Sequence, residues 1–270
     1  MGNRPPWDRV IVAATDDGFR EFFPMVCEAW ARFFPWTKIS LALVTDRDES
    51  DLAIERLALF GEVSLFRPIA GVPNPNHAKI ARYILAARYP DEACFIHDVD
   101  SVPLQNGYAI SIAEKWDRGE SLLAYSANVY KGEHLGKWWA QYQLAWGKTF
   151  GAIVNPNGLA DDRIIPDLCG MNNIDRYEDP SNPPDQFSDE SMIRALVLAG
   201  HVPVIHVPRK CDIMIEWVDR SWWGFDRVRL FTGRYLHCNM LRPMAENWGK
   251  LEPIAEYIYG RKVTLEEVAG

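Results

Sequence analysis

The sequence predicts a single α/β domain whose central sheet is mixed, mostly parallel and flanked by helices. Over roughly the first hundred residues, short apolar runs alternate with longer segments whose apolar residues recur at helical spacing. Strands that alternate with helices are typical of a parallel sheet covered on both faces. No repeat, low-complexity stretch or linker divides the 270 residues. One domain with two subregions is therefore the simplest organisation.

The first half supplies four strands and three helices to this expected sheet. We expect the second helix to turn Leu52 and Leu57 inward, with Ile54 as a further inward candidate. Pro and Asn in the segment 71–77 favour a loop before the third helix. The expected strands are 10–15, 39–45, 63–66 and 94–97, and the expected helices are 23–34, 51–60 and 79–89.

The second half has a less regular pattern. A dense run of Asn, Asp and Pro favours a long ordered loop over 151–188, ending at Ser188 as the cap of a helix. The other expected elements are a strand at 122–126, a helical segment at 133–150, a helix at 189–199, a strand at 202–207, an extended segment at 229–237 and a helix near 254–258.

Charge and composition exclude several classes of protein. The net charge of −8 and the lack of a basic stripe argue against nucleic acid as a partner. No stretch approaches the roughly 18 apolar residues of a membrane helix. The N-terminus also lacks an apolar signal-peptide core, so we expect a cytoplasmic protein. The five cysteines are scattered and odd in number, which favours reduced thiols over disulfides or a zinc site. The oligomeric state stays open, a homo-oligomer included.

Polar side chains follow three of the expected strands at the points where those strands end. In parallel sheets, ligands bind beyond the carboxyl ends of the strands. We therefore expect these side chains to converge on one edge of the sheet: Thr15, Asp16 and Asp17 after the first strand, Asp46 after the second, and Asp98 and Asp100 after the fourth.

The last two of these residues form an Asp-x-Asp pattern within CFIHDVDSVPL. In a regular strand, Asp98 and Asp100 would point to the same face, and at a turn both can still reach one ion. Carboxylate oxygens suit Mg²⁺ or Mn²⁺, and such an ion could bridge a diphosphate and stabilise its departure. The plainer alternative is two solvated carboxylates at a turn.

The segment from His77 to Leu104, HAKIARYILAARYPDEACFIHDVDSVPL, resembles the GT-A glycosyltransferases, especially the glycogenin and galactosyltransferase-like group. That resemblance implies a Rossmann-like GT-A fold and transfer of a sugar from a nucleotide-sugar donor, a UDP- or GDP-sugar. The acceptor would be a saccharide or another hydroxyl compound. It also implies Mn²⁺ (or Mg²⁺) held by Asp98 and Asp100.

Further residues acquire roles only through this resemblance. Lys79 or Arg82 would contact the nucleotide, although a solvated helix face is an equal alternative for both. The end of the first strand would match the family's base and ribose site, with Ala13, Thr15 and Asp17 as donor-binding candidates and Asp46 beside them. In this division, 1–125 binds the donor and 126–270 binds the acceptor.

The family's late metal-binding histidine has a partial match. The segment His237-Cys-Asn-Met-Leu-Arg-Pro-Met has similar spacing but lacks the family's Gly and Trp. The resemblance implies His237 as a third metal ligand and Arg242 as a diphosphate contact. A polar surface histidine is the alternative.

A second partial match is Asp185-Gln-Phe-Ser-Asp-Glu, which precedes an expected helix. Family members carry Asp-Gln or an acidic pair here. Asp189 or Glu190 would then act as the base that deprotonates the acceptor hydroxyl. Acidic residues at a helix start also simply complement the helix dipole, and the stereochemical outcome stays open.

Two rival readings remain. Asp98-Val-Asp-Ser-Val also fits the nucleophile motif of haloacid-dehalogenase-like phosphatases, with Asp98 as nucleophile and Asp100 as acid and base. That motif usually ends the first strand of its fold, whereas three expected strands precede it here. The second rival is a non-catalytic carbohydrate-binding protein on a related fold.

Overall fold

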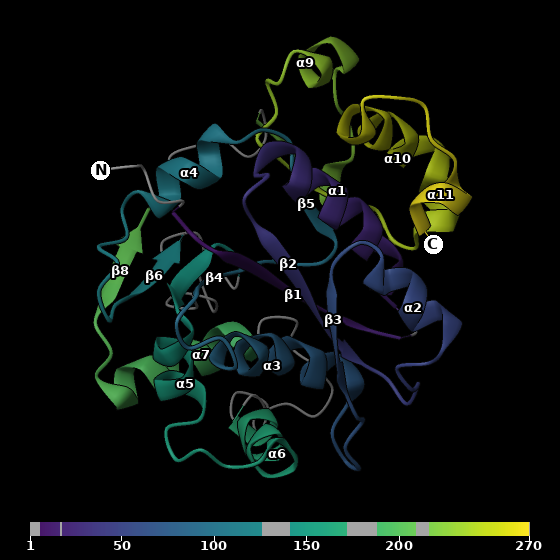
Figure 1. Ribbon diagram of the computed structural model, residues 1–270. Coiled ribbons are helices and arrows are strands. Elements are labelled where there is room, and N and C mark those ends of the chain that lie inside the picture. Colours follow the sequence, from purple (N-terminus) through teal and green to yellow (C-terminus); the bar gives the residue numbers. More distant parts are fainter. Residues whose placement is uncertain (1–5, 17, 126–140, 172–187, 209–215, 270) are drawn as a thin grey trace.

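The computed structural model describes residues 6–16, 18–125, 141–171, 188–208 and 216–269 (Figure 1). A seven-stranded sheet forms the centre of this part of the chain, in the order β3-β2-β1-β4-β7-β6-β8. Its strands are β1 (Arg9–Thr15), β2 (Lys38–Val44), β3 (Glu62–Phe66), β4 (Ala93–Ile96), β6 (Leu122–Tyr125), β7 (Gln143–Trp146) and β8 (Val204–Val207).

The pairing confirms the predicted mixed, mostly parallel sheet. Strand β1 runs parallel to both β2 and β4, β3 extends the parallel run beyond β2, and β6 is parallel to β8. Only β7 is antiparallel to its neighbours, β4 and β6, among these strands. A second sheet has three short strands in the order β5-β10-β9. These are β5 (Ser101–Pro103), β9 (Trp217–Val218) and β10 (His237–Asn239).

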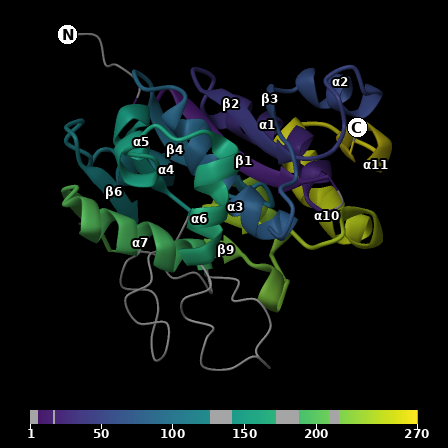
Figure 2. The same cartoon turned by 90° about the horizontal axis from the view of Figure 1, so that it is seen from below.

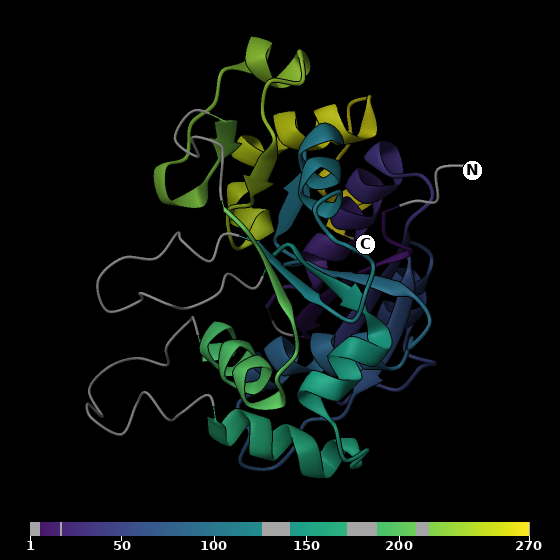
Figure 3. The ribbon, with the colours of Figure 1, turned by 90° about the vertical axis from the view of Figure 1, so that its left-hand side faces the viewer.

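Helices cover both faces of the large sheet (Figures 1 and 3). One face carries α1 (Phe23–Phe33), α4 (Gly107–Ala113), α10 (Met244–Tyr259) and α11 (Leu265–Ala269). The other carries α3 (Asn74–Ala87), α5 (Gly147–Val154), α6 (Asp161–Met171) and α7 (Ser188–Gly200), which come forward when the molecule is seen from below (Figure 2). The helix α2 (Leu52–Ala58) packs beside β3.

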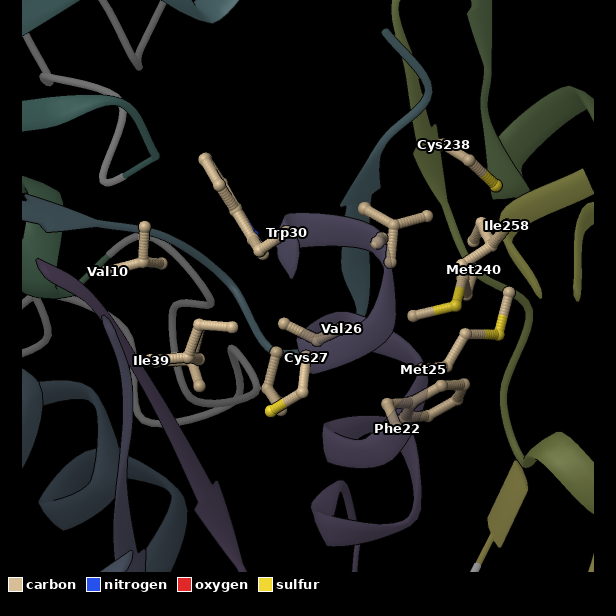
Figure 4. Packing of buried hydrophobic residues seen from close by; sticks show 14 of the residues in the cluster. Val10, Phe22, Met25, Val26, Cys27, Trp30, Ile39, Cys238, Met240 and Ile258 are labelled. Atoms are coloured by element: carbon tan, nitrogen blue, oxygen red, sulfur yellow. The ribbon is translucent and has the colours of Figure 1, made fainter. Parts of the chain in front are cut away.

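Alternation along β1 divides the core into two clusters. Val10 and Val12 belong to the cluster under α1, and Ile11 between them belongs to the cluster under α3. This follows from the period of two in a strand, which sends successive side chains to opposite faces. Figure 4 shows Trp30 and Val26 of α1 in the first cluster, together with residues of the strands. The helix α1 therefore joins the large sheet to the C-terminal part of the chain.

Three expectations about local structure are wrong. Leu52 is 71 % exposed, and only Ile54 and Leu57 bury the inner face of α2. Leu52 is the first residue of a short helix, which places it at the outer end. The helix α3 begins at Asn74, inside the expected loop, because proline is tolerated in a first helical turn. Residues 143–146 form β7 instead of continuing a helix, and α5 follows them.

Two further segments differ from expectation. The Asn- and Asp-rich region contains α6, whose first turn holds Asp161 and Asp162. Acidic side chains favour a helix N-terminus, a signal that the loop prediction overlooked. The expected extended segment at 229–237 overlaps the short helix α9 (Arg227–Phe231), which Asp226 caps by accepting from the amide of Arg229. Within the described residues, no helix is both long and apolar enough to cross a bilayer.

Gly147 provides a close contact between α5 and the end of α3. A Cβ atom added there would lie 2.1 Å from the carbonyl oxygen of Tyr89 and 2.5 Å from that of Ala86. Gly147→Ala should therefore lower the free energy of unfolding by about 3 kcal/mol in urea denaturation, since rigid backbone must move. Gly170→Ala in α6 is the matched control, because among the described residues no atom beyond its own helix backbone lies within 4 Å of the added Cβ. It should be neutral or stabilising by up to ~1 kcal/mol, and equal losses in both variants would contradict this packing.

His77 in α3 predicts a pH dependence of stability. Its side chain is 1 % exposed, and neither ring nitrogen has a hydrogen-bond partner among the described residues. Burial lowers the pKa of His77 below its ordinary value. The unfolded chain thus binds a proton near pH 6.5, while the folded chain binds it only at lower pH. The free energy of unfolding should therefore fall as pH drops below about 6.5.

Replacing His77 tests this. His77→Leu removes both the titration and two unpartnered polar atoms, so it should match or exceed wild-type stability at pH 7. Its advantage should grow as pH is lowered to 5, in urea titrations of both proteins. A constant difference across that range would show that His77 does not titrate as proposed.

Candidate functional site

The Asp-x-Asp segment forms the turn between the two sheets. The strand β4 of the large sheet ends at Ile96, and β5 of the small sheet begins at Ser101. The amide of Ser101 donates to the carbonyl of Asp98 at 3.3 Å, and the amide of Met240 donates to the carbonyl of Asp100 at 2.8 Å. The two carboxylates therefore lie at a junction between the sheets. Asp98 and Asp100 belong to a turn and do not share the face of one strand.

Arg82 and Gln141 hold the carboxylate of Asp98. The guanidinium Nη1 of Arg82 lies 2.6 Å from Oδ1, and the amide Nε2 of Gln141 donates to Oδ2 at 2.5 Å. Burial opposes ionisation, but the charge of Arg82 and the bond from Gln141 outweigh it, so the pKa of Asp98 lies below its ordinary value. About a third of this side chain, 32 %, remains exposed. Asp98 is thus an ionised group with a path to solvent.

Two other arginines face Asp100. Arg220 donates from Nη1 to Oδ2 of Asp100, and Nε of Arg242 lies 3.6 Å from the same oxygen. The Asp100 side chain is only 8 % exposed. Burial raises its pKa above the ordinary value, and the nearby charge of Asp98 adds to that effect against the attraction of Arg220. Arg242 also lies over the ring of Phe19, at 4.8 Å from its centroid.

A buried chain of hydrogen bonds links the two halves of the site. Gln141 donates to Oγ of Ser101 at 3.0 Å, and that hydroxyl donates to Oδ1 of Asn239 at 2.6 Å. Asn239 then donates from Nδ2 to Oδ2 of Asp219 at 2.7 Å. Asp219 also caps the short helix η4 (Arg220–Trp222) by accepting from the amide of Ser221 at 2.8 Å. This chain fixes the backbone from which Arg220 extends.

His237 lies beneath the site and is fully buried. Its Nδ1 is 2.7 Å from the hydroxyl of Tyr142, and its Nε2 is 3.0 Å from Oδ1 of Asn239. The ring of Trp217 packs on it at a centroid distance of 4.6 Å. Binding a cation would require His237 to give up one of these hydrogen bonds. Its role as a third metal ligand stays a prediction.

The residues predicted at the ends of β1 and β2 occupy varied surroundings. Thr15 is buried, Ala13 is half-buried, and the side chain of Asp46 is exposed while its carbonyl accepts from Arg67 at 2.7 Å. Asp17 lies outside the described residues. Their part in donor binding stays a prediction. Neighbouring Asp16 is already engaged, in ion pairs with Arg20 and Arg47.

The remaining candidates belong to α3 and α7. Lys79 is half-buried and lies one turn before Arg82. The Nε of Arg82 donates to the backbone carbonyl of Lys79 at 3.2 Å. Arg82 is buried, so the solvated-face alternative does not describe it. Glu190 is buried in the first turn of α7, which also contains Asp189, and the acid-base role of either residue stays a prediction. The Asp185-Gln pair lies outside the described residues.

Sequence reasoning missed Gln141, Arg220 and Asn239. Gln141 precedes a strand that the sequence analysis assigned to a helix, and Arg220 follows a two-residue strand that it did not predict. Neither residue belongs to a motif. The contacts of Gln141 and Arg220 with the Asp-x-Asp carboxylates span 43 and 120 residues, so no local pattern announced them.

The donor set of the site can be compared with the needs of a divalent cation. No third His, Cys, Asp or Glu joins Asp98 and Asp100 within the part of the chain that is described. Mg²⁺ is often bound by one or two carboxylates, with substrate phosphates and waters completing its shell. Asp98 and Asp100 therefore fit such a cation, provided that the arginines on them give way.

Comparison with known proteins shows which solved structures share this fold. No family model and no curated protein matches the chain. Among solved structures, the glycosyltransferase GlyE of Streptococcus pneumoniae TIGR4 aligns with a TM-score of 0.51 and 14 % identity, over 97 % of this chain and 62 % of that one. An active-site mutant of LgtC aligns with a TM-score of 0.50 and 15 % identity, over 95 % of this chain and 96 % of that one. The chain thus has the mixed α/β fold of these proteins.

Topology also weighs against the phosphatase reading. Three strands, β1 to β3, precede the strand that ends in the Asp pair. Asp161 and Asp162 begin α6 instead of closing a strand, and Asp98 is ion-paired to Arg82, which would weaken it as a nucleophile.

His237 offers a test of its two interpretations. His237→Ala would remove the hydrogen bonds that His237 shares with Tyr142 and Asn239 in the interior and open a cavity. We expect a loss of about 3 kcal/mol in the free energy of unfolding, measured in urea without added metal. His206→Ala, at an exposed position of β8, is the control and should change stability little. Wild-type stability together with weakened Mn²⁺ binding would instead support the ligand role.

Proposed function

We propose that this chain is a glycosyltransferase that moves a sugar from a nucleoside-diphosphate donor, a UDP- or GDP-sugar, to a saccharide or other hydroxyl acceptor. The observation that carries this proposal is the placement of Asp98 and Asp100 just beyond the carboxyl end of β4. That is where open α/β sheets bind their ligands. The fold shared with two glycosyltransferases supports it.

The site's charges suit a diphosphate together with a divalent cation. Asp98 and Asp100 would hold Mn²⁺ or Mg²⁺, which when bound supplies positive charge to the departing diphosphate. Arg242 is half-exposed beside Asp100, and a guanidinium there can donate to phosphate oxygens. Arg82 orients Asp98 through its 2.6 Å contact. These residues would bind and align the donor.

The transfer itself needs a base for the acceptor. The acceptor oxygen forms a bond to the anomeric carbon, and the bond from that carbon to the diphosphate oxygen breaks. The nucleoside diphosphate leaves with the electron pair. We propose that the hydroxyl proton passes to Asp189 or Glu190 at the start of α7.

Replacing the paired carboxylates tests the site. Asp98→Asn and Asp100→Asn keep the side-chain volume but remove the charge. Each should reduce Mn²⁺-dependent release of nucleoside diphosphate from a panel of UDP- and GDP-sugars by about 100-fold or more. Asp48→Asn is the matched control, since its carboxylate is 77 % exposed and pairs with Arg67 on the surface. Full release by Asp100→Asn would remove the carboxylate pair from the reaction.

The same panel separates the rival readings. Release of nucleoside diphosphate that needs Mn²⁺ supports the transferase. Sugar binding that needs neither metal nor nucleotide, without any release, would favour a carbohydrate-binding protein. Phosphate release from small phosphoesters would favour the phosphatase.

A further inference from the structure

The proposed function gives no role to Arg220, although this charged residue contacts Asp100. Its backbone is fixed, because Asp219 caps η4 and is itself hydrogen-bonded to Asn239. Its guanidinium lies on Asp100, and its side chain is 36 % exposed. By contrast, the Arg82 side chain is 6 % exposed and also donates to the carbonyl of Lys79. The backbone of Arg220 is therefore held in place, whereas its side chain has room to turn toward solvent.

Among the residues that the structure describes, the charges around Arg220 are balanced. Three guanidinium groups and three carboxylates act on one another here: those of Arg82, Arg220 and Arg242, and those of Asp98, Asp100 and Asp219. A diphosphate alone would add negative charge to a cluster in which each described guanidinium already faces a carboxylate. A divalent cation alone would have to displace a guanidinium from Asp100 and leave that guanidinium without an anion. Each ligand is opposed by the existing ion pairs.

The two ligands together remove this opposition. A cation can take the carboxylate of Asp100 while the diphosphate takes the released guanidinium, so every charge keeps a partner. A guanidinium can donate two parallel hydrogen bonds to a phosphate, as it does to a carboxylate. Arg242 favours the release of Arg220 from Asp100. Its Nε lies 3.6 Å from the Asp100 oxygen that Arg220 contacts, and its positive charge repels Arg220.

We propose that Arg220 is an exchangeable counter-ion that couples the binding of the divalent cation to the binding of the diphosphate. It neutralises Asp100 while the donor is absent and moves to the diphosphate when a cation takes Asp100. This inference rests on the proposed function. Its consequence is reciprocal, because each ligand must strengthen the binding of the other by the same factor.

Calorimetric titration of Mn²⁺ with and without UDP, and then GDP, measures this coupling. In the wild type, Mn²⁺ should bind weakly alone and at least ten-fold more tightly with the matching nucleotide. Arg220→Gln leaves only the longer of the two described arginine contacts on Asp100, that from Arg242, so it should bind Mn²⁺ alone at least ten-fold more tightly than the wild type does. Its gain in Mn²⁺ affinity from the nucleotide should shrink by a similar factor.

Two further variants serve as controls. Arg227→Gln removes a guanidinium that pairs with Glu256 away from the site, and it should behave as the wild type. Arg220→Lys keeps the charge on Asp100 and should keep Mn²⁺ binding weak in the absence of nucleotide. Circular dichroism and urea unfolding establish that each variant is folded.

The outcome that overturns the proposal is Arg220→Gln binding Mn²⁺ alone no more tightly than the wild type does, including the case in which neither binds it. This arm needs no nucleotide. A wild type that binds neither UDP nor GDP in the presence of Mn²⁺ would instead contradict the proposed function. The Mn²⁺-only comparison would still decide whether Arg220 blocks Asp100.

Discussion

Neutralisation of two carboxylates at the junction of two sheets is the constraint on which the rest of the structure depends. An ionised side chain that is buried without a partner costs several kcal/mol, so the buried Asp100 requires a cation, and the partly exposed Asp98 gains from one. Asp98 takes Arg82 from α3, on one face of the large sheet. Asp100 takes Arg220 from beside the small sheet. The site therefore forms only when elements from both halves of the chain have packed around the end of β4.

Much of the large sheet could be predicted from sequence, because its signals are local. A few residues are enough to predict a strand from the run between Val10 and Thr15, and a helix from the apolar stripe of α3. Asp98 and Asp100 follow directly from a buried strand, so their place at the sheet edge was also within reach. Arg82 could be placed on the helix before them, although its burial could not, since helical spacing alone does not say which faces are covered.

The rest depends on contacts that leave no local pattern. The strands β5, β9 and β10 are three, two and three residues long, too short for a period of two to emerge. Their pairing with one another brings His237 beneath the Asp pair and aligns Asn239 with Ser101. The sequence analysis interpreted His237 as a metal ligand or, alternatively, as a polar surface group. Its burial against Tyr142 and Trp217 follows from packing between distant segments, which no spacing rule encodes.

In the turn that carries the carboxylates, Asp98 follows β4 of the large sheet and Asp100 precedes β5 of the small sheet. The distance between the two carboxylates therefore depends on how the two sheets are oriented. The helix α1 contacts both sheets, and its Met25 belongs to the same apolar cluster as Met240, which follows β10 (Figure 4). Dense packing transmits small displacements, because interiors compress little. A change in the volume of the apolar side chains of α1 would tilt one sheet against the other. It could thus retune the spacing of the carboxylates without altering a single charged group.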